Sequence, residues 1–92
     1  MLEKDVEQHL VKRVKEIGGR SYKFVSPGNS GVPDRMVCLP GGQIIFVELK
    51  APGKESSEFQ KRQQKRLRDL GNSVYTFDSK ELIDGFIEAC KK

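Results

Sequence analysis

The 92-residue length predicts one domain, residues 1–92, with a small hydrophobic core. Hydrophobic residues make up 36% of the chain and charged residues 33%, a balance typical of a globular protein and not of a disordered one. No apolar run approaches the ~18 residues of a membrane-spanning helix, and residues 1–5 do not resemble a signal peptide, so a cytoplasmic location is expected. The two cysteines, Cys38 and Cys90, have no metal-binding or redox spacing and are expected to be partly buried free thiols.

Hydrophobic periodicity predicts the elements in chain order. They are a helix at about 5–17, strands at 22–25, 35–39 and 44–50, a helix at 57–70, a strand at 73–77 and a last helix that follows Ser79 and carries residues 82–90. Turn-forming residues fill the intervals between the strands. The order αβββαβα predicts an α/β fold with a mixed four-stranded sheet flanked by helices. Phe59, Leu67 and Leu70 are expected to form the apolar stripe of the second helix.

A carboxylate interrupts the apolar side of the first helix. At 100° per residue, Glu7 lies only ~20° beyond Val14, one of the residues of the apolar stripe. A half-buried carboxylate costs free energy unless it is paired or lies near a metal ion. The simpler alternative is a boundary glutamate that reaches solvent. His9 lies on the polar side of the same helix and is expected to be solvated, with no catalytic or metal-binding role.

Three charged residues are expected to converge at one end of a hairpin. Glu48 and Lys50 are two apart on a predicted strand and so share a face. The turn at Gly41-Gly42 brings Asp34, which precedes the neighbouring strand, level with them. Two carboxylates that repel each other favour a divalent cation, and a lysine beside them could act on a phosphate or on water. The plainer alternative is a surface ion pair near a turn-forming aspartate.

This chemistry requires a particular hairpin register. Opposed residues in an antiparallel hairpin share a face, so Asp34 faces the same way as Glu48 only if the loop has an odd number of residues or a bulge. We therefore predict a three-residue loop over 41–43, which glycine favours. Pro40 would then pair with Ile44, and Asp34 would lie opposite Lys50.

Basic residues concentrate in and just before the second helix. A clustered basic surface favours a polyanionic partner such as DNA, although a solvated helix face is the ordinary alternative. Contacts to phosphates position DNA without reading its sequence, so any selectivity is expected to be for DNA structure. The candidate DNA-binding residues are Lys54, Lys61, Arg62, Lys65 and Arg66.

Pro33-Asp34 followed by Glu48-Leu49-Lys50 fits the PD-(D/E)xK signature of metal-dependent nucleases. Together with the flanking segments at 23–28, 31–35 and 46–54, these residues resemble the stand-alone, phage-type VRR-Nuc domain over about residues 5–84. The resemblance implies a restriction-endonuclease-like core that cleaves DNA with Mg²⁺ or Mn²⁺. It also implies a homodimer that acts like a Holliday junction resolvase on branched DNA such as four-way junctions.

The resemblance also implies roles for individual residues. Asp34, Glu48 and the backbone carbonyl of Leu49 would hold the metal, and Glu7 would reach it directly or through water. Lys50 would orient and deprotonate the attacking water, or stabilise charge developing on the scissile phosphate.

Gln60 matches a glutamine of the same family and would position water or a phosphate oxygen. Because it also lies three residues after Ser57, it could instead serve only as part of a helix capping box.

Two other functions remain open from the sequence. These are a non-catalytic nucleic-acid-binding module, which the basic cluster favours, and a ribonuclease that uses the same site.

Overall fold

The computed structural model describes residues 2–91 and contains the seven predicted elements in the predicted order. They are α1 (Glu3–Glu16), β1 (Arg20–Lys23), β2 (Arg35–Leu39), β3 (Gln43–Leu49), α2 (Glu58–Asp69), β4 (Ser73–Phe77) and α3 (Lys80–Cys90). The first strand begins two residues earlier than predicted. None of the helices within residues 2–91 is both long and apolar enough to cross a membrane.

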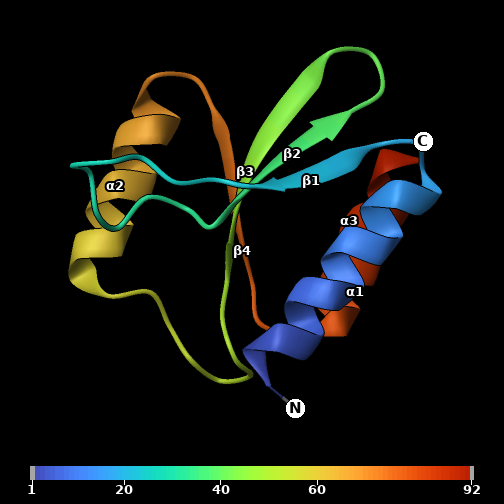
Figure 1. Ribbon diagram of the computed structural model, residues 1–92, viewed down its shortest axis with the longest axis horizontal. Coiled ribbons are helices and arrows are strands. Elements are labelled where there is room, and N and C mark those ends of the chain that lie inside the picture. Colours follow the sequence, from blue (N-terminus) through green and yellow to red (C-terminus); the bar gives the residue numbers. More distant parts are fainter. Residues whose placement is uncertain (1, 92) are drawn as a thin grey trace.

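The four strands form one mixed sheet in the order β1-β2-β3-β4 (Figure 1). The first three strands are antiparallel neighbours, and β4 lies parallel to β3. A parallel neighbour requires a crossover connection, which α2 provides. The predicted α/β fold with a mixed four-stranded sheet is therefore confirmed.

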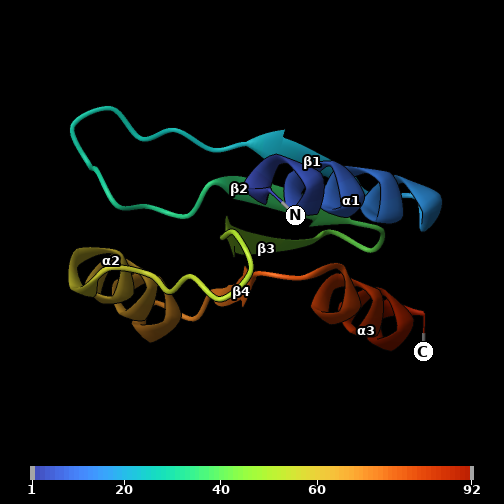
Figure 2. The ribbon, with the colours of Figure 1, turned by 90° about the horizontal axis from the view of Figure 1, so that it is seen from below.

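One face of the sheet carries the hydrophobic core. Figure 1 and Figure 2 show α1 and α3 near each other on this face, with α2 well separated from both. Side chains alternate between the two faces along a strand, so every second residue of β2 and β3 points into the core. The core residues are Val6, Leu10, Val14, Val37, Leu39, Ile45, Val47, Leu49, Phe77, Ile83 and Ile87.

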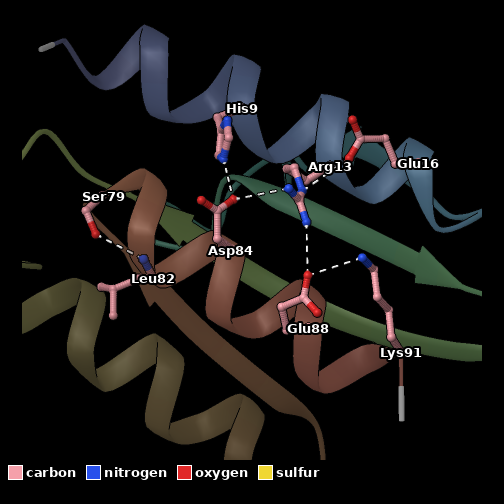
Figure 3. A network of polar contacts seen from close by, with 8 residues as sticks. All are labelled: His9, Arg13, Glu16, Ser79, Leu82, Asp84, Glu88 and Lys91. Atoms are coloured by element: carbon pink, nitrogen blue, oxygen red, sulfur yellow. Dashed lines mark hydrogen bonds and ion pairs between the residues drawn. The ribbon is translucent and has the colours of Figure 1, made fainter.

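Charged side chains join α1 to α3 at the edge of this core (Figure 3). Nε2 of His9 lies 2.7 Å from Oδ1 of Asp84, and Arg13 lies 3.7 Å from both Asp84 and Glu88. The hydrogen bond with His9 lowers the pKa of Asp84 below its ordinary value. The expectation of a solvated His9 was wrong, because its side chain contacts Asp84 of α3 and is only 18% exposed.

The inward side of α2 is largely polar, and only Leu67 of the predicted apolar stripe is partly buried. Phe59 is 45% exposed and Leu70 is 76% exposed, whereas Gln64 is the buried residue of the helix. Nε2 of Gln64 donates a hydrogen bond to Oγ of Ser56, which satisfies the buried amide. The prediction was wrong for Phe59 and Leu70 because α2 packs beside β4, away from the core that α1 and α3 share with the sheet.

The loop between β2 and β3 has three residues, as the parity argument requires, but not the three that were predicted. Leu39 pairs with Gln43, so the loop consists of residues 40–42. Gly41 and Gly42 both have left-handed backbone conformations, with φ of 89° and 83°. Glycine adopts these conformations without steric cost, so the turn is complete at Gly42 and Gln43 belongs to the strand.

This register sets the position of the candidate site. Arg35 pairs with Val47, and continuing the ladder by one residue places Asp34 opposite Glu48. The predicted pairing of Asp34 with Lys50 was therefore wrong by two residues. A two-residue shift keeps the face of every side chain, so Asp34 and Glu48 lie on the same face of the sheet, away from the core.

Candidate active site

Asp34 lies just before β2 and is held against β3. Its Oδ2 accepts a hydrogen bond of 3.0 Å from the backbone N–H of Leu49. Pro33, the residue before it, is fully buried and anchors the chain at this point. The backbone carbonyl of Asp34 also accepts a bond of 2.8 Å from the N–H of Phe24. The carboxylate is thus fixed by backbone contacts at the end of the hairpin.

Glu48 is 1% exposed, and its two carboxylate oxygens have different surroundings. Oε2 accepts a hydrogen bond of 3.2 Å from Nε2 of Gln60 and lies 3.2 Å from Nζ of Lys50. Oε1 is also buried and has no hydrogen-bond partner in the structure of residues 2–91. Buried carboxylate oxygens are rarely left without a partner, so Oε1 is a candidate ligand atom.

The charge on Glu48 is disfavoured by its surroundings. Burial raises the pKa of Glu48 above its ordinary value, and the negative charge of Asp34 raises it further, while Lys50 acts in the opposite direction. A bound divalent cation would offset both the burial and the repulsion. Mg²⁺ commonly uses one or two carboxylates together with water and substrate phosphates. The pair of Asp34 and Glu48, with the free Oε1, fits such an ion.

Gln60 takes part in the capping box of α2 and also contacts two of the predicted site residues. Its Oε1 accepts hydrogen bonds from the N–H of Ser57 at 2.9 Å and from Nζ of Lys50 at 2.8 Å. The N–H of Gln60 in turn donates to Oγ of Ser57, which completes the capping box of α2. Its Nε2 reaches Glu48. The helix cap therefore fixes the amide that joins Lys50 to Glu48.

Glu7 is the predicted site residue whose carboxylate is paired elsewhere. Its Oε2 lies 3.1 Å from Nη2 of Arg35, a side chain that is 10% exposed. This ion pair accounts for a half-buried carboxylate on α1 without a metal ion. Arg35 lies next to Asp34 in the chain but points to the opposite face of the sheet.

Glu7 is nevertheless close to Asp34, since both line a pocket of ≈ 210 Å³. Glu3, one turn before Glu7 on α1, lines the same pocket, and its negative charge contributes to the raised pKa of Glu48. Sequence reasoning did not identify Glu3, although its spacing of four residues from Glu7 places both on one helix face. Within residues 2–91, no three Asp, Glu, His or Cys side chains are close enough to form a metal site by themselves.

The candidate DNA-binding residues form two groups. Lys54 and Lys61 line one pocket of ≈ 350 Å³ between the loop after β3 and α2. Arg62, Lys65 and Arg66 line a shallow depression on the outer side of α2. Two of these side chains already have carboxylate partners on the helix, because Lys61 lies 3.7 Å from Glu58 and Lys65 lies 2.7 Å from Asp69.

Arg68, a further basic residue of α2, has a structural contact. Nη2 of Arg68 donates a hydrogen bond of 2.8 Å to the carbonyl of Val74 in β4. This contact covers part of an edge strand, and it separates Arg68 from the cations that remain available to a phosphate backbone.

We expect Glu48→Gln to stabilise the metal-free protein, by an amount that depends on pH. A raised pKa in the folded state means that the stability contributed by Glu48 is fully present below the unfolded value, near 4.5, and is lost as the pH rises through the folded value. Glutamine at position 48 does not ionise, so the variant does not lose stability in this way as the pH rises. Urea unfolding of both proteins with a chelator present should show a difference that grows with pH above 4.5 and then levels off. Equal stability of the two proteins throughout this range would contradict the electrostatic account of Glu48.

The chain is similar to known proteins in both sequence and structure. No family model matches the chain. Over 80 residues it is 55% identical to "Putative nuclease p44" of Acyrthosiphon pisum secondary endosymbiont phage 1, which covers 87% of this chain and 86% of the phage protein. A solved structure described as "VRR_NUC domain" superposes with a TM-score of 0.87 at 34% sequence identity, over 94% of each chain. Since both similarities extend over nearly the whole length of the proteins compared, this chain belongs to the VRR-Nuc family.

Proposed function

We propose that residues 1–92 form a single VRR-Nuc nuclease domain that acts as a metal-dependent, structure-selective endodeoxyribonuclease. It would hydrolyse phosphodiester bonds in branched DNA such as four-way junctions, in the manner of a Holliday junction resolvase of phage or prophage origin. Membership of the family and the 55% identity to a phage protein named as a nuclease support nucleic-acid cleavage.

The observation that carries the proposal is the unpartnered, buried Oε1 of Glu48 beside a second carboxylate, Asp34. These two side chains and the backbone carbonyl of Leu49 would hold Mg²⁺ or Mn²⁺, since all are hard oxygen ligands. When bound, the cation would lower the pKa of the attacking water and offset the charge that develops on the phosphate. Glu7 would act through water, because Arg35 already holds its carboxylate.

Lys50 would stabilise charge on the scissile phosphate. An ammonium group has three N–H donors, and two of them have acceptors here, Oε1 of Gln60 and Oε2 of Glu48. The third remains free for a phosphate oxygen. These two contacts hold the ammonium group beside Glu48, which supports electrostatic stabilisation as the role of Lys50. Gln60 would position Lys50 and Glu48, since its amide joins both of them.

The basic residues of α2 and the preceding loop would position the DNA. Lys54, Lys61, Arg62, Lys65 and Arg66 are all exposed, as contacts to backbone phosphates require. Such contacts carry no base information, which supports selectivity for DNA structure over sequence. Binding through these residues is expected to weaken steeply as the salt concentration rises.

Cleavage assays with a four-way junction, a flap, a nicked duplex and single-stranded RNA test this function. With Mg²⁺ or Mn²⁺ present and no chelator, we expect the branched DNA to be cut fastest. DNA binding without cleavage of any substrate would contradict the proposal and favour a non-catalytic binding module. Preferential cutting of RNA would indicate a ribonuclease.

We further predict that the active form is a homodimer. A four-way junction needs two coordinated cuts on opposing strands, and a two-fold dimer supplies two sites related by symmetry. Exposed apolar residues on or beside α1 and α3, such as Leu2 at 69% and Leu82 at 51%, are candidates for the interface. Sedimentation should give twice the chain mass of 10.4 kDa at working concentrations. A monomer that still resolves junctions would contradict this prediction.

A further inference from the structure

Two segments supply residues to the proposed site, and they also contact each other at a point outside the site. One is the loop over residues 24–34, which ends at Asp34, and the other is α2, which carries Gln60. We propose that Phe59 and Gly31 form a clasp between these segments, and that both are positioning residues for the catalytic centre. This inference rests on the proposed nuclease function, because it assigns how the same site is held in place.

The contact between the two segments is close. A Cβ atom added to Gly31 would lie 2.7 Å from Cδ2 of Phe59 and 2.9 Å from Cε2, distances that real Cβ atoms essentially never show. Gly31 also has a φ of +84°, a conformation that side chains disfavour. One turn along α2, Nε2 of Gln63 donates a hydrogen bond of 3.2 Å to the carbonyl of Ser30. Phe59 and Gln63 are four residues apart, so one face of the helix makes both contacts.

Elsewhere in the projecting part of the loop, Asn29 makes local contacts. The N–H and side chain of Asn29 bond to Ser26 and to the carbonyl of Pro27, all within the loop. In Figure 1 and in Figure 2 the loop extends beyond the sheet on the side where α2 lies. The clasp therefore connects the projecting part of the loop to α2. The residue that follows Phe59 on this helix is Gln60, which contacts Glu48 and Lys50.

Phe59 is suited to positioning rather than to holding the core together. Its side chain lies outside the hydrophobic core, and the residue is 45% exposed. The guanidinium of Arg62 lies 5.7 Å from the centre of its ring, and the ring also lies against Gly31 of the loop. Removing the ring should consequently leave the core intact but take away one support of the loop, and so loosen the contact of Asp34 with Leu49.

Four variants separate the clasp from backbone strain. Phe59→Ala removes the ring, and Gly31→Ala places a methyl group against it. Gly28→Ala is the matched control, because Gly28 lies in the same loop with a φ of +80° but has nothing within 4 Å of an added Cβ. Phe59→Leu tests rescue, since it restores an apolar side chain of similar reach. Thermal unfolding checks that each protein is folded.

The first measurement needs neither metal nor DNA. The N–H of Leu49 bonds to Oδ2 of Asp34, so its hydrogen exchange reports where that carboxylate lies. We expect faster exchange at Leu49 in Phe59→Ala and Gly31→Ala than in Gly28→Ala, approaching the rate in Asp34→Ala. Phe59→Leu should recover most of the protection. Wild-type protection at Leu49 in both clasp variants would overturn the proposal.

The second measurement is cleavage at saturating metal. Residues that orient catalytic groups typically contribute 10–100-fold, so kcat should fall by about that factor in Phe59→Ala while KM for DNA changes little. An unchanged kcat would overturn the positioning role, and a change confined to KM would assign Phe59 to DNA binding instead. This failure is distinct from failure of the proposed function, in which the wild-type protein would cleave no substrate or Asp34→Ala and Glu48→Ala would still cleave.

Discussion

Replacing Asp34 or Glu48 by alanine should abolish DNA cleavage without unfolding the protein or releasing DNA. The two carboxylates are the proposed metal ligands, whereas DNA affinity is expected to come from lysine and arginine contacts to phosphates. A metal ion contributes several kcal/mol to the transition state, so losing it should lower the rate on the order of 10³-fold or more. Glu48→Ala also removes a buried charge that burial and Asp34 disfavour, so the metal-free fold should persist.

The measurement compares single-turnover cleavage with DNA binding and thermal unfolding for each variant. Glu81→Ala is a suitable control, because this exposed carboxylate lies in the first turn of α3 and is the same kind of side chain. We expect Glu81→Ala to cleave at the wild-type rate. Wild-type cleavage by Asp34→Ala or Glu48→Ala would remove the proposed metal site, and with it the proposed mechanism.

Much of the fold could be predicted from hydrophobic periodicity. Val6, Leu10 and Val14 recur at helical spacing, and the structure buries all three between α1, α3 and the sheet. The pattern succeeds there because burial on one side of a helix is what creates the pattern. In α2 the same reasoning failed, because the inward side of that helix carries Gln60 and Gln64, whose partners are polar.

The geometry of the site could be predicted in part. The face shared by Asp34 and Glu48 follows from loop parity, which depends only on the two-residue period of a strand. The exact pairing depends on which residues adopt left-handed conformations, and Gly41 and Gly42 both do so. Sequence alone allowed the turn to include either neighbour of this glycine pair, so the register remained undetermined.

Contacts between distant segments could not be predicted from the sequence patterns. Arg35 pairs with Glu7 across 28 positions of the chain, and no local spacing indicates this pair. The same holds for the contact of His9 with Asp84, which exists only because α3 packs beside α1. These interactions depend on the packing of whole elements, which propensity and periodicity do not specify.

Lys50→Met should lower kcat by about 10²–10⁴-fold, because it removes the ammonium group expected to stabilise charge on the phosphate. KM for DNA should change little, since the exposed basic residues remain. The variant should also move the acid limb of the pH profile. Lys50 lowers the pKa of Glu48, so its loss lets that pKa rise, and Glu48 then ionises only at higher pH.

Lys50→Arg separates the two effects of this lysine. Arginine keeps the positive charge that lowers the pKa of Glu48, but its planar fork cannot reproduce the geometry of an ammonium held by Gln60 and Glu48. We therefore expect a reduced kcat with an acid limb near the wild-type position, measured as single-turnover rates across pH. If Lys50→Met instead cleaves at the wild-type rate, Lys50 only balances the charge of buried Glu48, and another group must stabilise the phosphate.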